Sequence, residues 1–154
     1  MERQILKFVN KSQNQNPSYG DSDNSGFDIR AWINENNGKI KIKPLERRMI
    51  HTGLYFELPK NTELQVRPRS GMSIKLGLTV INTPGTVDEG FTGELCVLLI
   101  NLSNEEVIVE NGDRIAQAVL CPVYNGNLTS LEEIEEITKD TERGSGGFGH
   151  SGVK

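Results

Sequence analysis

The stretch GELCVLLINLSNEEVIVENGDRIAQAVLCPV, residues 93–123, contains three short apolar segments separated by polar turn residues. The segments 93–103, 105–110 and 114–123 are rich in Val, Ile and Leu, which favour strands, and Asn111-Gly112-Asp113 is a typical turn. Outside this stretch, the same pattern predicts strands over residues 5–9, 26–33, 39–43, 49–58, 62–67 and 78–82. Many short strands at this spacing predict an all-β fold of the sandwich, jelly-roll or small-barrel type.

Helical signal is scarce. Residues 70–77, SGMSIKLG, are compatible with one or two helical turns. In residues 130–138, SLEEIEEIT, Leu131 and Ile134 lie three apart, which permits a short helix, although the acidic spacing is equally typical of a solvated connector. We therefore expect little helix.

Composition limits the classes of function. The chain has 154 residues with 17 Lys and Arg against 21 Asp and Glu, a formal net charge of −4, and its length suits one domain with a single core. No apolar run approaches the roughly 20 residues of a membrane span, and we expect no signal peptide at MERQILKFVN. Net negative charge argues against binding to long nucleic acids, although a local arginine cluster can still hold a phosphate. We expect a soluble, cytoplasmic protein without nucleic-acid or membrane partners.

Cys96 and Cys121 lie in apolar stretches, and we expect both to be free and buried, in agreement with a reducing compartment. No C-x-x-C or H-x-x-x-H spacing is present, so a structural zinc site is not expected. We interpret His51 as a packed or interface histidine.

The end of the chain, RGSGGFGHSGVK at 143–154, contains five glycines. Residues 144–149 fit G-x-G-x-x-G, but only five residues follow, too few for the helix and acidic residue of a dinucleotide site. Two interpretations remain. Composition favours a disordered tail. Alternatively, Arg143 binds a phosphate and Phe148 stacks on a base, a contact worth about 1–3 kcal/mol.

Four further segments carry polar groups suited to chemistry, and each also has an ordinary structural explanation. SGFDI places Asp28 in an apolar strand, where an ion-pair carboxylate is the plain alternative. PRSG sets Arg69 at the start of a possible helical turn, whose backbone N–H groups favour anions. NTPGTVDEGFTG, residues 82–93, is a turn-rich hairpin around Asp88, and GDRIAQ, residues 112–117, ends at Gln117. We expect Arg114 to form a structural ion pair with its neighbour in this last segment.

In this order, and followed by the glycine-rich end, these segments resemble the five ordered motifs of the trimeric deoxyuridine triphosphatase (dUTP diphosphatase) family, from about residue 26 to 152. The resemblance implies a distorted jelly-roll β-barrel over residues 1–142 and a mobile, flexible tail over 143–154 that closes over the active site. It implies a homotrimer with active sites shared between subunits. The implied reaction is Mg²⁺-assisted hydrolysis of dUTP to dUMP and pyrophosphate, which limits uracil incorporation into DNA and supplies dUMP for thymidylate synthesis.

The resemblance also assigns roles in the chemistry. Asp88 matches the catalytic carboxylate that orients and deprotonates the water attacking the α-phosphorus. Asp28 matches an acid that meets Mg²⁺ through coordinated water, as suits a cation that keeps its hydration shell. The positions that match phosphate or water contacts are Arg69, Ser70, Gly71 and Gln117.

Selection of the base and sugar is implied in the same way. The matching hairpin residues are Asn82, Thr86, Val87, Phe91 and Cys96. Asn82 matches the side chain that reads the uracil edge, the Thr86-Val87 stretch leaves no room for a thymine methyl, and Phe91 matches a ring under the deoxyribose. The matching residues of the tail are Arg143 on the γ-phosphate, Phe148 stacked on uracil, Gly149 and Ser151.

Two positions depart from the family pattern. Phe91 stands where the family most often has Tyr, and we predict that the ring alone still rejects UTP. His150 stands where Ser is more usual, and our hypothesis is that protonated His150 strengthens triphosphate binding.

Two other functions stay open at this point. A dCTP deaminase of the same superfamily would share the fold, and Glu94 would be its candidate acid, with a surface or interface carboxylate as the plain alternative. A nucleotide-responsive binding module would keep the site without catalysis. The glycine-rich end and Asp88 favour the hydrolase over the deaminase.

Overall fold

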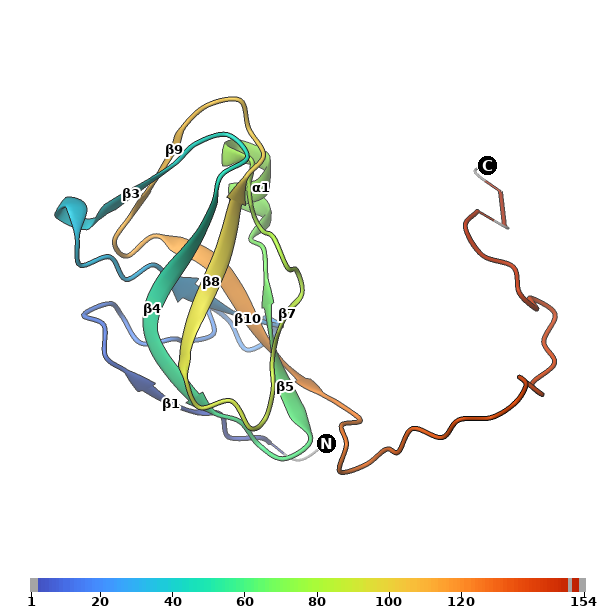
Figure 1. Cartoon of the computed structure of the whole chain (residues 1–154). Helices are drawn as coiled ribbons and strands as arrows, with labels where there is room; N and C mark the ends of the chain where they lie inside the picture. Colours follow the sequence, from blue (N-terminus) through green and yellow to red (C-terminus); the bar gives the residue numbers. More distant parts are fainter. Residues whose placement is uncertain (1–2, 150, 153–154) are drawn as a thin grey trace.

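The computed structural model describes residues 3–149 and 151–152, and its body is two antiparallel sheets and a two-stranded ribbon (Figure 1). The first sheet has the order β1 (Lys7–Asn10), β4 (Arg47–Glu57), β8 (Glu94–Asn101), β6 (Leu78–Val80). The second has the order β2 (Phe27–Arg30), β10 (Arg114–Pro122), β5 (Thr62–Arg67), β7 (Gly85–Val87). The ribbon pairs β3 (Lys39–Ile42) with β9 (Val107–Glu110). The predicted all-β jelly-roll class with little helix is confirmed.

The helical elements of the described residues are α1 (Ser70–Leu76) and a 3-10 turn at Asn36–Gly38. The helix α1 falls in the predicted stretch and ends at Gly77, whose left-handed φ of 65° suits glycine. The permitted helix over 130–138 is wrong, because these residues run without helix. Leu131 and Ile137 are exposed there, and a short helix without a packed apolar face is not stable in water.

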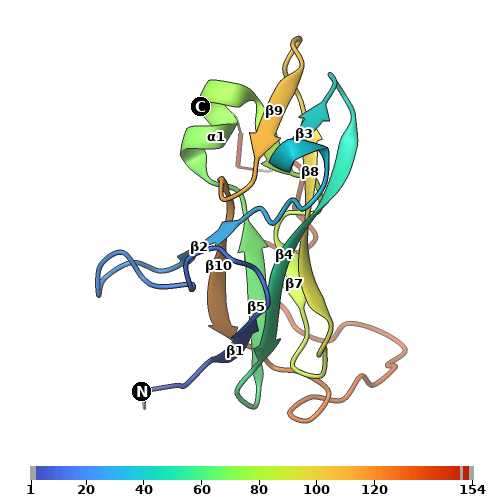
Figure 2. The ribbon, with the colours of Figure 1, turned by 90° about the vertical axis from the view of Figure 1, so that its left-hand side faces the viewer.

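The core lies between the two sheets and also reaches the ribbon. Figure 2 shows the strands of the body from the side. Alternation along the strands builds the core: in β8, Leu95, Val97 and Leu99 point inward and are buried. Leu64 of β5 and Ile29 of β2 meet them from the second sheet and have no exposed surface. Burying each such side chain contributes about 1.5–3 kcal/mol.

The same alternation turns Cys96 to the outer face of β8. Both cysteines are free, as expected, but the expectation that they are buried is wrong: Cys96 and Cys121 are each half-buried. On β8 the inward positions are taken by the larger apolar side chains of Leu95, Val97 and Leu99.

A bulge interrupts β4 between His51 and Leu54, where its pairing with β8 shifts register. Gly53 lies in the bulge with φ 69°, and a Cβ atom there would approach the backbone nitrogen of Ser12 to 2.7 Å. Only glycine fits this position without strain. The bulge turns the backbone N–H groups of Thr52 and Gly53 toward the start of β8.

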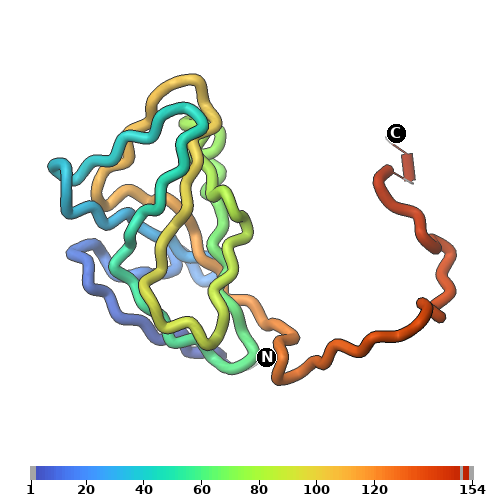
Figure 3. The backbone as a smooth tube through the Cα atoms, viewed as in Figure 1, coloured from blue at the N-terminus to red at the C-terminus, as the bar shows by residue number. Residues whose placement is uncertain are grey.

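After β10 the chain leaves the body as an extended arm (Figure 3). Its described residues from 126 onward are exposed, except for the half-buried Gly146. Within residues 3–149 and 151–152, no helix is both long and apolar enough to cross a membrane.

Candidate functional site

One candidate site is built on the second sheet, where a row of paired residues crosses three strands. Asp28 of β2 pairs in register with Gln117 of β10, and Gln117 pairs with Arg67 of β5. The chain then passes from β5 through Pro68 into α1. We call the polar group gathered at this end of the sheet the anion cluster; its members are Asp28, Arg69, Ser70, Gly71, Arg114 and Gln117.

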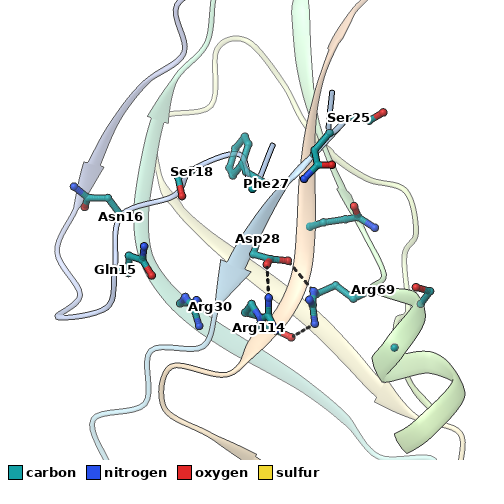
Figure 4. Close-up of a pocket in the computed structure, with 15 residues that line it drawn as sticks. Gln15, Asn16, Ser18, Ser25, Phe27, Asp28, Arg30, Arg69 and Arg114 are labelled. Atoms are coloured by element: carbon teal, nitrogen blue, oxygen red, sulfur yellow. Dashed lines mark hydrogen bonds and ion pairs between the residues drawn. The ribbon is translucent and has the colours of Figure 1, made fainter. Parts of the chain in front are cut away.

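Asp28 joins two guanidinium groups in this cluster (Figure 4). Arg69 Nε donates to Asp28 Oδ1 at 2.7 Å, and Arg114 Nη1 donates to Oδ2 at 3.2 Å. Arg69 Nη1 also lies 3.5 Å from the backbone oxygen of Arg114. Two positive groups against one negative group leave the cluster net positive, and the remaining N–H groups of each fork suit phosphate oxygens.

The prediction that Arg114 pairs with the neighbouring Asp113 is therefore wrong. The neighbouring Asp113 instead accepts the backbone N–H of Glu110 at 2.8 Å, while Arg114 reaches across to Asp28. Arg114 thus belongs to the site.

Gln117 is anchored to the backbone at one end of α1 and lies close to Gly26. Its Nε2 donates to the backbone oxygen of Pro68 at 2.9 Å, which ties β10 to the chain entering α1. A Cβ atom on Gly26 would lie 2.9 Å from the Ala118 oxygen and 3.2 Å from Gln117 Oε1. The absence of a side chain at Gly26 therefore lets β2 approach β10 closely at the site.

The anion cluster lines an open cavity of about 830 Å³, a size suited to a small ligand. The chain before β2 forms the other wall with polar side chains. Sequence reasoning missed these residues, among them Gln15, Asn16, Ser18, Asn24 and Ser25, and it also missed Arg30 at the end of β2. The density of Asn, Ser and Gln over residues 11–25 was the available signal.

A second candidate site lies in the hairpin that contains β7. Its cavity of about 270 Å³, which we call the hairpin cavity, is lined by Asn82, Thr86, Val87, Asp88, Phe91, Glu94, Leu95, Cys96 and Leu98. All five residues expected to select base and sugar therefore come together here with Asp88.

The groups of this cavity are less constrained than those of the anion cluster. The Asp88 carboxylate makes no hydrogen bond or ion pair with any residue that the structure describes, and it is exposed. The backbone N–H of Phe91 donates to the Asp88 carbonyl at 3.0 Å, which closes a tight turn. The Phe91 ring packs on Gly93, where a Cβ atom would lie 2.7 Å from Cζ.

Two ionisable groups of the hairpin cavity have shifted pKa values. Burial opposes ionisation of Glu94, but hydrogen bonds from Gly53 and His51 outweigh it and lower the pKa of its carboxyl below the ordinary 4.5. Burial, and then the charge of Glu94, raise the pKa of the Cys96 thiol.

The two sites lie far apart within one chain. Val87 of β7 pairs with Leu64, three residues along β5 from Arg67, which lies level with Gln117 and Asp28. The strands β7 and β2 are separated by three strand spacings of about 4.8 Å, and Val87 and Asp28 are offset by three residues of about 3.3 Å along the strands. Val87 and Asp28 therefore lie about 17 Å apart. Asp88 follows Val87 at the far end, and one chain does not bring its carboxylate to the anion cluster.

The candidate residues of the arm meet neither site. Arg143, Phe148, Gly149 and Ser151 are exposed, and Arg143 Nε donates to the backbone oxygen of Gly146 at 2.9 Å. His150 lies outside the described residues.

The donor set of the anion cluster is compatible with Mg²⁺ through water. Among the described residues, Asp28 is the one carboxylate that lines the cavity, and each of its oxygens accepts a hydrogen bond from an arginine. A carboxylate has about four acceptor positions, so two remain for the water ligands that Mg²⁺ normally keeps.

The model of the dUTPase family matches residues 13–152 of the chain. The deoxyuridine 5'-triphosphate nucleotidohydrolase of Treponema denticola is 52% identical over 137 residues, 89% of this chain and 90% of that protein. The protein of the same name from Finegoldia magna is 46% identical over 147 residues, 96% and 98% of the two chains. Among solved structures, a mutant dUTPase of Staphylococcus bacteriophage 80alpha with dUpNHpp superposes with a TM-score of 0.83, covering 98% of this chain and all of that one at 24% identity. This last likeness bears on the fold alone.

Proposed function

The chain belongs to the dUTPase family and is a dUTP diphosphatase, and we propose that it converts dUTP to dUMP and pyrophosphate in active sites shared between subunits of a homotrimer. The proposal rests on the separation of about 17 Å between the two ends of the second sheet, which follows from ordinary strand and residue spacings. A bound dUTP molecule must contact the residues that bind its phosphates and the residues that bind its base at the same time. The hairpin of one subunit and the anion cluster of its neighbour together supply both.

Asp88 acts as the general base in this proposal. Its carboxylate has no partner among the described residues and is free to accept a proton from water. General-base catalysis of this kind increases the rate by about 10²–10⁴-fold. The attacked atom is the α-phosphorus, and dUMP and pyrophosphate separate when the bond to the bridging oxygen breaks.

The anion cluster binds the triphosphate. Arg69 presents a guanidinium already oriented by Asp28, and oriented charge stabilises the transition state without reorganisation. Ser70 and Gly71 lie exposed beside it. Apart from its chain neighbours and the backbone of its own helix, no described atom lies within 4 Å of a Cβ built on Gly71, so a phosphate can approach the backbone. Gln117 contacts the phosphates or the attacking water.

Mg²⁺ fits this site as the cofactor, and Asp28 would hold it through water while it binds the triphosphate. When bound, it neutralises phosphate charge. Arg69 and Arg114 hold the Asp28 carboxylate in place, which favours this indirect contact over direct ligation.

The hairpin cavity selects the nucleoside. Asn82 reads the uracil edge, backbone groups up to Cys96 complete its hydrogen bonds, and Thr86 and Val87 close the space for a thymine methyl. The Phe91 ring lies under the deoxyribose. A ribose hydroxyl there would be crowded and unpaired, and a buried unpaired polar group is unfavourable.

The arm supplies the last contacts in this proposal. Residues 143–154 close over the loaded site as a mobile tail beside the 1–142 domain, with Arg143 and Ser151 on the γ-phosphate, Phe148 on uracil and Gly149 at the turn (φ 91°). The role of His150 in phosphate binding stays a hypothesis. The enzyme would act in the cytoplasm, limiting uracil in DNA and supplying dUMP for thymidylate synthesis.

The deaminase alternative would need Glu94 as an acid that transfers protons. Its carboxylate accepts the N–H groups of Thr52 and Gly53 and faces His51, an arrangement that keeps it ionised. A binding module remains compatible with the fold, but the unpaired Asp88 favours catalysis.

Product analysis tests the function. The full chain is incubated with Mg²⁺ and dUTP, dCTP, dTTP or UTP in parallel, and the products are separated by ion-exchange chromatography. We expect dUMP and pyrophosphate from dUTP alone. A uracil nucleotide formed from dCTP would show a deaminase, and binding of dUTP without turnover would show a binding module.

A further inference from the structure

A cluster of three ligand-type side chains lies on the outer face of the first sheet, away from the anion cluster. His51 of β4 and Cys96 of β8 are cross-strand partners, and Glu94 lies two residues before Cys96 on the same face. His51 Nδ1 lies 2.9 Å from Glu94 Oε2 and 3.6 Å from Cys96 Sγ. One ligand atom of each residue lies within 4.8 Å of the other two.

These separations are close to those around a tetrahedral metal ion. Zinc bonds of about 2.0–2.1 Å to nitrogen and oxygen and about 2.3 Å to sulfur place N and S about 3.6 Å apart, and N and O about 3.4 Å apart. The N–S distance between His51 Nδ1 and Cys96 Sγ is already 3.6 Å. The N–O distance of 2.9 Å is that of a hydrogen bond and needs to open by about half an ångström on ligation.

The bulge of β4 orients the carboxylate. Glu94 Oε1 accepts the N–H of Gly53 at 2.9 Å and that of Thr52 at 3.2 Å, so Oε2 is left facing the imidazole. Hydrogen bonds of this kind to a ligating carboxylate fix its direction and increase metal affinity. The side chain of Glu94 is 19% exposed, whereas that of His51 is 53% exposed, so a metal ion can enter from the His51 side.

We propose that His51, Glu94 and Cys96 form a binding site for a divalent transition metal, of which Zn²⁺ fits best, with a fourth position open to solvent or ligand. A thiolate and an imidazole select Zn²⁺ over Mg²⁺ or Ca²⁺, which prefer oxygen ligands alone. The Glu94 carboxylate and the Cys96 thiolate balance the charge of the ion, and the thiol proton is released to solvent on binding. The site adjoins the hairpin cavity, which Glu94 and Cys96 also line.

Cobalt provides a test that does not depend on activity. The full chain, freed of metal and without nucleotide, is titrated with Co²⁺ while the near-ultraviolet band of sulfur-to-cobalt charge transfer is recorded. We expect a band that saturates at one Co²⁺ per chain and disappears when Zn²⁺ is added. The charge-transfer band does not depend on whether the chain hydrolyses dUTP. The metal site and the proposed function are therefore tested separately.

Matched variants locate the ligands. Cys96→Ser should abolish the band, whereas Cys121→Ser, at the other free cysteine, should leave it unchanged. Glu94→Gln keeps an oxygen for the N–H groups of the bulge and should weaken Co²⁺ binding at least about tenfold, as should His51→Ala. Circular dichroism of each variant reports whether the sheets are intact, and Cys96→Ala provides a second variant if Cys96→Ser misfolds.

A wild-type chain that shows no charge-transfer band at millimolar Co²⁺ would overturn the proposal. A band that persists in folded Cys96→Ser or Cys96→Ala would do the same.

Discussion

The anion cluster and the hairpin cavity differ in how completely one chain assembles them. In the anion cluster, Asp28, Arg69 and Arg114 are already joined by ion pairs, and Gln117 is fixed to the backbone. In the hairpin cavity, the Asp88 carboxylate has no partner among the described residues. The first site is oriented before substrate arrives, while the second presents an unpaired reactive group.

This difference has a physical reason in the proposed function. A triphosphate site needs several positive groups close together, and a carboxylate such as Asp28 is needed to hold them against their mutual repulsion. A general base needs the opposite, because an ion pair to Asp88 would lower its affinity for the proton it must accept. Keeping the two at opposite ends of the second sheet prevents the cluster arginines from pairing with Asp88 in the free chain.

Removal of the unpaired carboxylate should have the largest effect. Asp88→Asn should lower kcat for dUTP by about 10²–10⁴-fold with little change in KM, because the amide does not accept the proton of the water. Steady-state kinetics measures both constants. The matched control is Glu89→Gln: Glu89 accepts hydrogen bonds from the Asn61 N–H and from Asn125, a structural role, and kcat should persist. Equal loss in the two variants would contradict the role of Asp88.

Removal of the arm should have the next largest effect. A chain ending at residue 142 should lose about 10- to 100-fold in kcat/KM, because it lacks the stacking of Phe148, worth about 1–3 kcal/mol, and the charge of Arg143. Its thermal unfolding should be unchanged, since both side chains are exposed and contact neither site. A lower unfolding temperature with full activity would show that the arm supports the fold instead.

The ring in the hairpin cavity should control sugar choice. Phe91→Ala should reduce the preference for dUTP over UTP about tenfold, because a cavity without the ring admits the ribose hydroxyl. Phe91→Tyr should keep the preference, and the ratio of the two kcat/KM values measures it. Comparable turnover of UTP and dUTP by the unmodified chain would already contradict our prediction that Phe91 rejects UTP.

The smallest effect should come from Glu94 at the edge of the hairpin cavity. Its carboxyl has a folded-state pKa below the ordinary 4.5, so it stabilises the fold above that pH and loses this contribution as the pH falls through the lowered pKa. Glu94→Gln keeps a hydrogen-bond acceptor but not the ionisation. Urea unfolding at fixed subunit concentration should therefore show a flatter decline of the free energy of unfolding below about pH 4.5. An unchanged slope would contradict the ionised state that we assign to Glu94.

Most of the fold could be predicted from local patterns. The segment 62–67 alternates apolar and polar residues, and the strand β5 (Thr62–Arg67) has those bounds. The strand β7 (Gly85–Val87) was not predicted, because three residues between turns give too little periodicity. The prediction of a possible helix over 130–138 was wrong. The spacing of apolar residues shows that a helix would have an apolar face, but it does not show whether another surface covers that face.

The site residues were predicted unevenly, for a geometric reason. Groups adjacent in sequence, such as those of the hairpin 82–93, come together as expected. Arg114 pairs with Asp28, which is 86 positions away, and His51 meets Cys96 across 45 positions. Strand pairing produces such contacts, and the spacing of motifs or ligands along the sequence does not reveal them. A search for C-x-x-C or H-x-x-x-H spacing therefore could not find the cluster at His51.

Mixed trimers test the shared site most directly. Asp88→Asn and Arg69→Ala chains, each inactive alone, are coexpressed with different tags, and trimers carrying both tags are purified. In a shared-site trimer, every such assembly contains one site with an intact hairpin and an intact neighbouring anion cluster. We therefore predict about one third of the wild-type rate. Activity no higher than that of either parent would contradict a site assembled from two subunits.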